Sequence, residues 1–134
     1  MGPDGKAQTI LVVEDNSLMR KLFVRCLEEG GYRVIEAEDP RTVIARMRAA
    51  APDLVVMDIV MPNLSGVELI RQIRNDRTLA ATPVVALTNL ATTADRRRLV
   101  EAGFDGHISK PITPKDFLTT VAGILGAAVA MHPA

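Results

Sequence analysis

The chain has 134 residues, 48% of them hydrophobic, and its 16 basic and 16 acidic side chains give a formal net charge of zero. This length suits one domain with one core and is too short for two. Neutral charge, together with three Phe, one Tyr and no Trp, excludes an overall electrostatic or base-stacking signature for nucleic acid. The single cysteine excludes an internal disulfide and a cysteine-based zinc site.

The sequence carries no recognisable targeting signal. No apolar run reaches the roughly 18 residues of a membrane span, and the polar N-terminus lacks the apolar core of a signal peptide. We therefore expect a cytoplasmic monomer with no membrane or nucleic-acid partner. The domain is expected at residues 9–125, between a flexible lead-in of residues 1–8 and a short tail of residues 126–134.

Short runs rich in β-branched residues alternate with longer stretches of helical apolar spacing. Strands are expected at residues 9–13, 32–36, 53–57, 83–87 and 106–108. The first, third and fourth runs are apolar almost throughout, which is typical of the centre of a parallel sheet covered on both faces. Five β–α units with short links predict an α/β fold, a doubly wound five-stranded parallel sheet with helices on both faces. Five units favour the flavodoxin-like strand order 2-1-3-4-5.

The first helix is expected to begin near Asn16 or Ser17 and to stop at Gly30-Gly31. Its expected core stripe consists of Met19, Leu22, Phe23, Cys26 and Leu27. The residues expected off this stripe, which suit docking on a kinase helix bundle, are Leu18, Lys21, Val24 and Arg25. Four further helices are expected to follow or open at Pro40, Ser65, Thr92 or Thr93, and Thr113. The fourth carries Leu99 and Val100.

Polar residues follow four of the expected strands. Glu14-Asp15 follows the first, Asp58 the third, Thr88 the fourth and Ser109-Lys110 the fifth. Ligands of open α/β sheets bind at the carboxyl ends of the strands, so these side chains are expected to converge. Two unit charges about 4 Å apart interact by about 4 kcal/mol at an effective dielectric of about 20, so clustered carboxylates need a compensating cation. Oxygen ligands with room for water favour Mg²⁺.

Each of these residues has an ordinary structural role when taken alone, such as a helix cap, a loop acid or a surface lysine. Their combination at four strand ends is far more specific. Asp58 is therefore the candidate phosphoryl acceptor, because a carboxylate can act as a nucleophile. Lys110 and the Thr88 hydroxyl are candidates for binding the oxygens of the transferred group.

In combination the motifs resemble the receiver domain of two-component response regulators. The resemblance is carried by residues 10–16, 53–62 with Gly66, 83–88 and 109–111, and it covers about residues 8–125. The lack of an output domain is similar to the single-domain members of the CheY/DivK type. The resemblance implies a phosphorelay switch that catalyses only its own phosphorylation and dephosphorylation and is otherwise no enzyme.

The resemblance also implies a role for each site residue. Asp58 would accept a phosphoryl group from a histidine kinase or a histidine phosphotransfer protein. Asp15, Asp58 and the backbone carbonyl of Val60 would ligate Mg²⁺, and Glu14 would act through a water on the ion.

Lys110 would pair with the phosphate and Thr88 would move to hydrogen-bond it, and the Lys110–Pro111 bond would be cis. The signal would pass to a downstream protein through the fourth helix, the fifth strand and the fifth helix. Two residues depart from the family pattern. Asn89 stands where a small residue is usual, and His107 replaces an aromatic switch ring.

Three alternatives remain open from the sequence. The chain could be an adaptor that signals without phosphate, or the receiver fragment of a larger regulator or hybrid kinase. An aspartyl-phosphate phosphohydrolase is disfavoured, because the position two residues after Asp58, where such enzymes carry a second acid, is Val60.

Overall fold

The computed structural model describes residues 7–59, 65–89 and 92–131, with side chains described up to residue 126. Five parallel strands form one sheet in the order β2-β1-β3-β4-β5. The strands are β1 (Thr9–Val13), β2 (Arg33–Ala37), β3 (Leu54–Asp58), β4 (Val84–Thr88) and β5 (Gly106–Ser109). The helices are α1 (Ser17–Glu29), α2 (Val43–Ala50, preceded by a 3-10 turn at Pro40–Thr42), α3 (Gly66–Asn75), α4 (Thr93–Ala102) and α5 (Pro114–Met131). The predicted fold class and strand order are confirmed.

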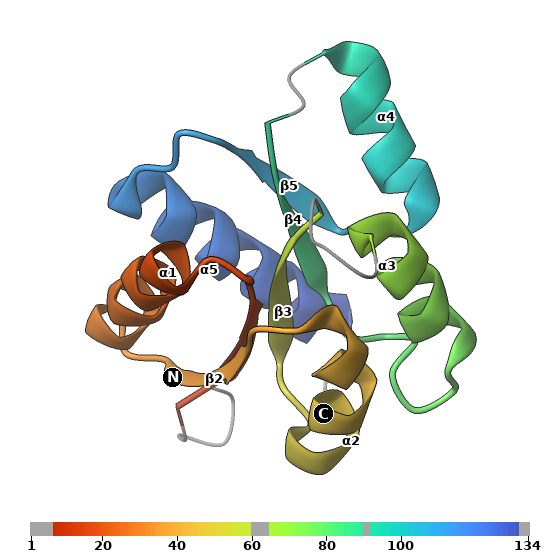
Figure 1. The fold of residues 1–134 in the computed structure, drawn as a ribbon, viewed down its shortest axis with the longest axis horizontal. Coiled ribbons are helices and arrows are strands. Elements are labelled where there is room, and N and C mark those ends of the chain that lie inside the picture. The colour runs from red at the N-terminus through yellow and green to blue at the C-terminus, as the bar shows by residue number, and fades with distance from the viewer. Residues whose placement is uncertain (1–6, 60–64, 90–91, 132–134) are drawn as a thin grey trace.

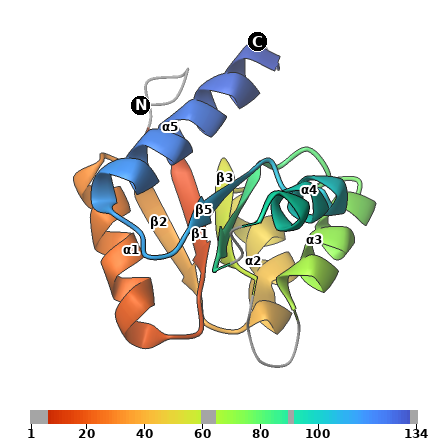
Figure 2. The same cartoon turned by 90° about the horizontal axis from the view of Figure 1, so that it is seen from above.

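The helices form two layers around the sheet. Helices α1 and α5 cover one face, and α2, α3 and α4 cover the other (Figures 1 and 2). Strand residues alternate between the two cores. In β1, Ile10 and Val12 pack with Phe23 and Phe117 beneath α1 and α5, whereas Leu11 packs on the opposite face. The rings of Phe23 and Phe117 meet edge to face with centroids 5.3 Å apart. Burial on both faces explains why the central strands are apolar throughout.

The predicted helix starts agree with the observed caps. The side chain of Asn16 accepts a hydrogen bond from the backbone N–H of Met19 at 3.0 Å. The hydroxyls of Ser65 and Thr92 cap α3 and α4 in the same way. Strand β1 has its predicted bounds, and the bounds of the other strands differ from those predicted by at most one residue. Helix α5 continues to Met131, beyond the predicted domain end at residue 125.

Three side chains lie differently from the sequence prediction. Leu22, expected in the core stripe of α1, is 53% exposed, and Val24, expected outside it, packs partly buried against the core. The core face of α1 is centred on Phe23 and Leu27, which places Val24 on its flank and turns Leu22 outward. In α4, Leu99 is buried and Val100 is 65% exposed, because neighbouring helical residues point about 100° apart.

The side chain of Arg74 connects the elements at the amino ends of β4 and β5. The guanidinium of Arg74, in the last turn of α3, donates hydrogen bonds to the carbonyls of Thr82 and Gly103 and to the carboxylate of Asp105. The same Asp105 oxygen accepts the backbone N–H of Val84 at 2.8 Å. Arg74 therefore joins α3 to the start of β4 and to the α4–β5 turn.

Replacing Arg74 by Met should lower the free energy of unfolding by about 2–4 kcal/mol, because the carbonyls and the carboxylate lose charged donors. Urea denaturation measures the change. Arg71→Met, at an exposed position of the same helix, is the matched control and should stay within about 0.5 kcal/mol of the wild type. Equal losses in the two variants would contradict the assigned role of Arg74.

Candidate functional site

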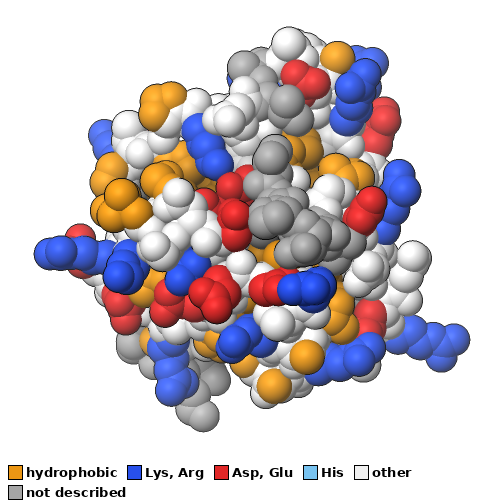
Figure 3. All heavy atoms as spheres, in the orientation of Figure 1, with side chains coloured by type: hydrophobic (Ala, Val, Ile, Leu, Met, Phe, Trp, Pro, Cys, Tyr) orange, Lys and Arg blue, Asp and Glu red, His pale blue; other side chains and the backbone are white. Residues whose placement is uncertain are grey.

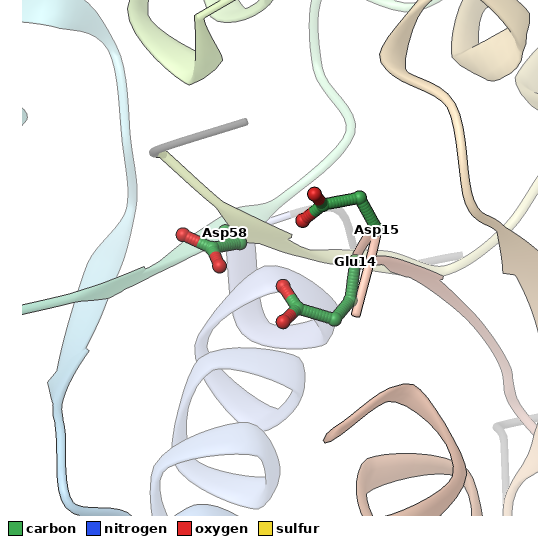
Figure 4. Close-up of side chains that lie close together, drawn as sticks. All are labelled: Glu14, Asp15 and Asp58. Atoms are coloured by element: carbon green, nitrogen blue, oxygen red, sulfur yellow. The ribbon is translucent and has the colours of Figure 1, made fainter. Parts of the chain in front are cut away.

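Three acidic side chains come together at the carboxyl edge of the sheet. Glu14 and Asp15 follow β1 directly, and Asp58 is the last residue of the neighbouring strand β3. One carboxylate oxygen from each residue lies within 4.8 Å of the others (Figure 4). Glu14 and Asp58 are buried, at 2% and 5% exposure, whereas Asp15 is exposed. The cluster is therefore open to solvent through Asp15.

The backbone at these strand ends is held by the sheet. The N–H of Glu14 donates to the carbonyl of Ala37 at 3.1 Å, and Ile59 donates to Leu87 at 3.3 Å. Gly66 approaches Ile59 so closely that a Cβ on the glycine would lie 2.6 Å from the Ile59 Cα atom. The start of α3 therefore packs tightly against the residue that follows Asp58.

Lys110 supplies the positive charge facing this cluster. Its Nζ atom lies 3.0 Å from Oδ2 of Asp58, and its side chain is 24% exposed. The backbone N–H of Lys110 donates to the carbonyl of Thr88 at 2.8 Å. The bond from Lys110 to Pro111 is cis, as the resemblance to receiver domains implied.

Thr88, Asn89 and Pro111 lie at or just beyond the carboxyl ends of β4 and β5. Thr88 is buried at the end of β4, the strand between β3, which ends in Asp58, and β5, which Lys110 follows. Asn89 and Pro111 are exposed, and His107 is half-buried on β5, opposite Ala86. The carbonyl of Val60 lies outside the described residues.

The electrostatics of the cluster favour a cation. Burial, the hydrogen bond to Asp58 and the negative charges of Asp58 and Asp15 together raise the pKa of Glu14 from 4.5 to about 8, with Lys110 acting in the opposite direction. Within the described part of the chain, Oε2 of Glu14 is buried without a hydrogen-bond partner. A buried acceptor of this kind costs free energy unless a proton or a cation satisfies it. The donor set consists of oxygens, which fits a hard divalent ion such as Mg²⁺.

In the view of Figure 3, acidic side chains gather near the middle of the molecule, with Lys and Arg side chains beside them and around the periphery. One of the basic residues near the cluster was not singled out by the sequence analysis. Arg20, in α1, donates from Nη1 to the carbonyl of Glu14 at 2.9 Å. Arg20 lies three residues before Phe23 and seven before Leu27, a spacing that places it on the core side of α1. This spacing is the sequence signal that could have identified it, since an arginine on the core side of a helix needs a partner.

The chain belongs to the response regulator receiver domain family, whose model matches residues 10–122. A curated relative is the polar-differentiation response regulator DivK of Brucella ovis, 36% identical over 121 residues, covering 90% of this chain and 98% of the relative. Receiver domains act in phosphorelay signalling, bind Mg²⁺ at an acidic site and interact with histidine kinases and downstream targets. Such proteins are generally not metabolic enzymes.

Solved structures agree with this family. The chemotaxis response regulator CheY4 of Vibrio cholerae superimposes with a TM-score of 0.84 at 26% identity, covering 89% of this chain and 99% of the other. The receiver domain of a sensor histidine kinase from Pseudomonas aeruginosa gives a TM-score of 0.81 at 28% identity, covering 90% and 98%. That structure has a magnesium ion coordinated in its active-site cleft. Within the described residues of the present chain, no helix is both long and apolar enough to cross a membrane.

The raised pKa of Glu14 predicts how stability depends on pH in the presence of a chelator. Between about pH 4.5 and 8 the folded state holds a proton on Glu14 that the unfolded state releases. The free energy of unfolding should therefore fall as the pH rises through this window, and Mg²⁺ should oppose the fall. Denaturant unfolding at pH 5 and pH 8 measures the slope.

Glu14→Gln is the control for this titration, because the amide carries no proton that titrates in the window. Its slope should be flatter than that of the wild type. A wild-type stability that rises with pH, or an equal slope in the variant, would contradict the assignment.

Proposed function

We propose that this chain is a phosphorelay switch that accepts a phosphoryl group on Asp58 from a histidine kinase or a histidine phosphotransfer protein. The observation that carries the proposal is the buried Asp58 carboxylate, held 3.0 Å from Lys110 within a cluster of three acids. A carboxylate in contact with a lysine at the open edge of the sheet can act as a nucleophile toward an electrophilic phosphorus.

In the proposed transfer, an oxygen of Asp58 attacks the phosphorus of a phosphohistidine. The new P–O bond forms as the P–N bond breaks, and the electron pair returns to the imidazole nitrogen of the donor. Lys110 pairs with the oxygens of the transferred group, and the Thr88 hydroxyl donates a hydrogen bond to them. Water later attacks the acyl phosphate, which releases inorganic phosphate and restores the Asp58 carboxylate. These two reactions at its own side chain, phosphorylation and dephosphorylation, are the only ones that the chain is proposed to catalyse.

The proposed Mg²⁺ ligands are Asp15, Asp58 and the carbonyl of Val60, with Glu14 as an outer carboxylate. Two observations support this set: Oε2 of Glu14 has no hydrogen-bond partner among the described residues, and the carboxylate oxygens are clustered. When bound, the ion neutralises the negative charge of the acids and of the phosphoryl oxygens.

Incubation with acetyl phosphate and Mg²⁺ should add the mass of one phosphoryl group to the intact protein. Asp58→Asn should abolish the adduct, because the amide is no nucleophile toward phosphorus. Glu68→Gln, at an exposed position in the first turn of α3, is the matched control and should be modified like the wild type. An unmodified wild type would support a phosphate-independent adaptor, and rapid turnover of many phosphate esters would support a phosphohydrolase.

Helix α1 offers a docking surface for the phosphodonor. Leu18 and Leu22 are 65% and 53% exposed, and Lys21 and Arg25 are exposed beside them. The spacing of these four residues places them on one face of the helix. Helix α1 begins two residues after Asp15, so the Leu18 end of this face is the end nearer the acidic site. An apolar stripe flanked by basic residues suits a helix of the donor protein.

Charge reversal by Arg25→Glu should slow phosphotransfer from the donor protein by about tenfold and leave the reaction with acetyl phosphate unchanged. Arg71→Glu, exposed on α3 on the opposite face of the sheet, makes the same charge change elsewhere and should behave like the wild type. The rate at which phosphorylated protein forms is measured separately with the donor protein and with acetyl phosphate. Equal slowing with both donors would contradict docking at α1.

The proposed output surface consists of α4, β5 and α5. An acyl phosphate adds nearly two negative charges, and Thr88 would shift to satisfy them and bias the packing of this surface. His107 lies half-buried on β5 and is proposed to change its burial with this shift. Asn89 is exposed beside Thr88 and is proposed to narrow access to the acyl phosphate. Exposed arginines at positions 96–98 fit a solvated face of α4.

His107→Ala should weaken binding of the phosphorylated protein to its downstream partner by about fivefold, because the ring contributes to the altered surface. Calorimetry with phosphorylated and unphosphorylated protein measures the difference. Unchanged affinity of the phosphorylated variant would show that His107 has no switching role.

A cytoplasmic monomer in which residues 9–125 form the switch domain suits signalling by protein–protein contact. The neutral charge and the few aromatic residues support partners that are proteins and not nucleic acids.

A further inference from the structure

We propose that Arg20 positions the Glu14-Asp15 pair for cation binding by holding the peptide group that joins these two residues. The inference rests on the proposed Mg²⁺ site and adds to it a residue that is no ligand itself. It starts from the contact between Arg20 Nη1 and the carbonyl oxygen of Glu14, at 2.9 Å.

The guanidinium of Arg20 spans from α1 to the end of β2. Besides the Glu14 carbonyl, its Nε donates to Oε1 of Glu36 at 3.2 Å, and its Nη2 lies 3.6 Å from Oε2 of Glu38. The Arg20 side chain is 13% exposed, whereas those of Glu36 and Glu38 are 50% and 76% exposed. The two glutamates therefore hold the guanidinium from the solvent side, and its inner edge reaches the backbone of the site. A planar fork with several donors suits this bridging role better than a lysine.

The backbone of Glu14 is held at both of its polar groups. Its N–H donates to the carbonyl of Ala37 at 3.1 Å, and its carbonyl accepts from Arg20. That carbonyl belongs to the planar peptide unit between Glu14 and Asp15. Its orientation sets the directions in which both acidic side chains leave the backbone. The Arg20 contact thus acts on two of the three acids at once.

Position and charge make opposite predictions for the loss of Arg20. The guanidinium is a positive charge near the acidic cluster, so on charge alone its removal should strengthen cation binding. If Arg20 positions the acids, its removal should weaken cation binding, because the Glu14–Asp15 peptide group loses the hydrogen bond from the guanidinium. Partners that orient metal ligands typically contribute about 10–100-fold to metal affinity. The sign of the change therefore separates the two roles.

The test is a Mg²⁺ titration of the full chain in three forms: wild type, Arg20→Met and Arg20→Lys. The changes of the backbone amide chemical shifts in NMR spectra report the binding. Arg20→Met should weaken Mg²⁺ binding by about tenfold. Arg20→Lys keeps the charge and loses the fork, and should weaken it by about threefold. Arg41→Met is the matched control, because Arg41 is exposed at the same edge of the sheet and pairs with Asp39. It should bind Mg²⁺ like the wild type or slightly more tightly.

Thermal melts without metal separate positioning from general stability. A purely structural role would lower the melting temperature of the Arg20 variants and leave Mg²⁺ affinity, measured well below that temperature, unchanged. Unchanged or tighter binding in either folded Arg20 variant would overturn the positioning role. If Arg20→Met does not fold, Arg20→Lys carries the test. A wild type that binds no Mg²⁺ would instead overturn the proposed metal site itself.

Discussion

Bringing three carboxylates together beside one lysine is the physical constraint on which the site depends. Glu14 and Asp58 are buried at neighbouring strand ends, and Asp15 completes the cluster from the solvent side. Their mutual repulsion and the loss of water around Glu14 raise the free energy of the fully ionised state. Strands β1 and β3 are buried on both faces, and the free energy gained by this burial offsets the cost. A divalent cation relieves it, so the same feature that is unfavourable for folding makes the site ready to bind metal.

The strand order explains why these residues meet. Strands β1 and β3 are neighbours at the centre of the sheet. From β1 the chain continues outward to β2 on one side, and from β3 it continues outward to β4 on the other side. Helix α1 leaves β1 over one face, and α3 packs on the other (Figure 2). Ligand sites of open α/β sheets form at such a switch point. The polar residues at the ends of β4 and β5 lie on the β4 side of this point, which places Lys110 against Asp58.

The sequence predicted the sheet, the helix caps and the acids because these depend on local signals. Central strands are apolar runs, caps need particular side chains, and strand ends carry the polar residues. The sequence did not predict which side of α1 faces the core at the edges of the apolar stripe. Leu22 and Val24 lie at opposite edges of this stripe, and tertiary packing determines which of the two is buried. The contacts of Arg20 and Arg74 were missed for a related reason. Long side chains reach partners on other elements, and no local spacing encodes those partners.

The most direct test of the account is a crystal structure of the protein with Mg²⁺ and beryllofluoride, which mimics the acyl phosphate. The account predicts the beryllofluoride on an oxygen of Asp58, Mg²⁺ between Asp15 and Asp58, and Lys110 and Thr88 in contact with the fluorides. A beryllofluoride bound to another residue, or an ion bound away from the three acids, would contradict it.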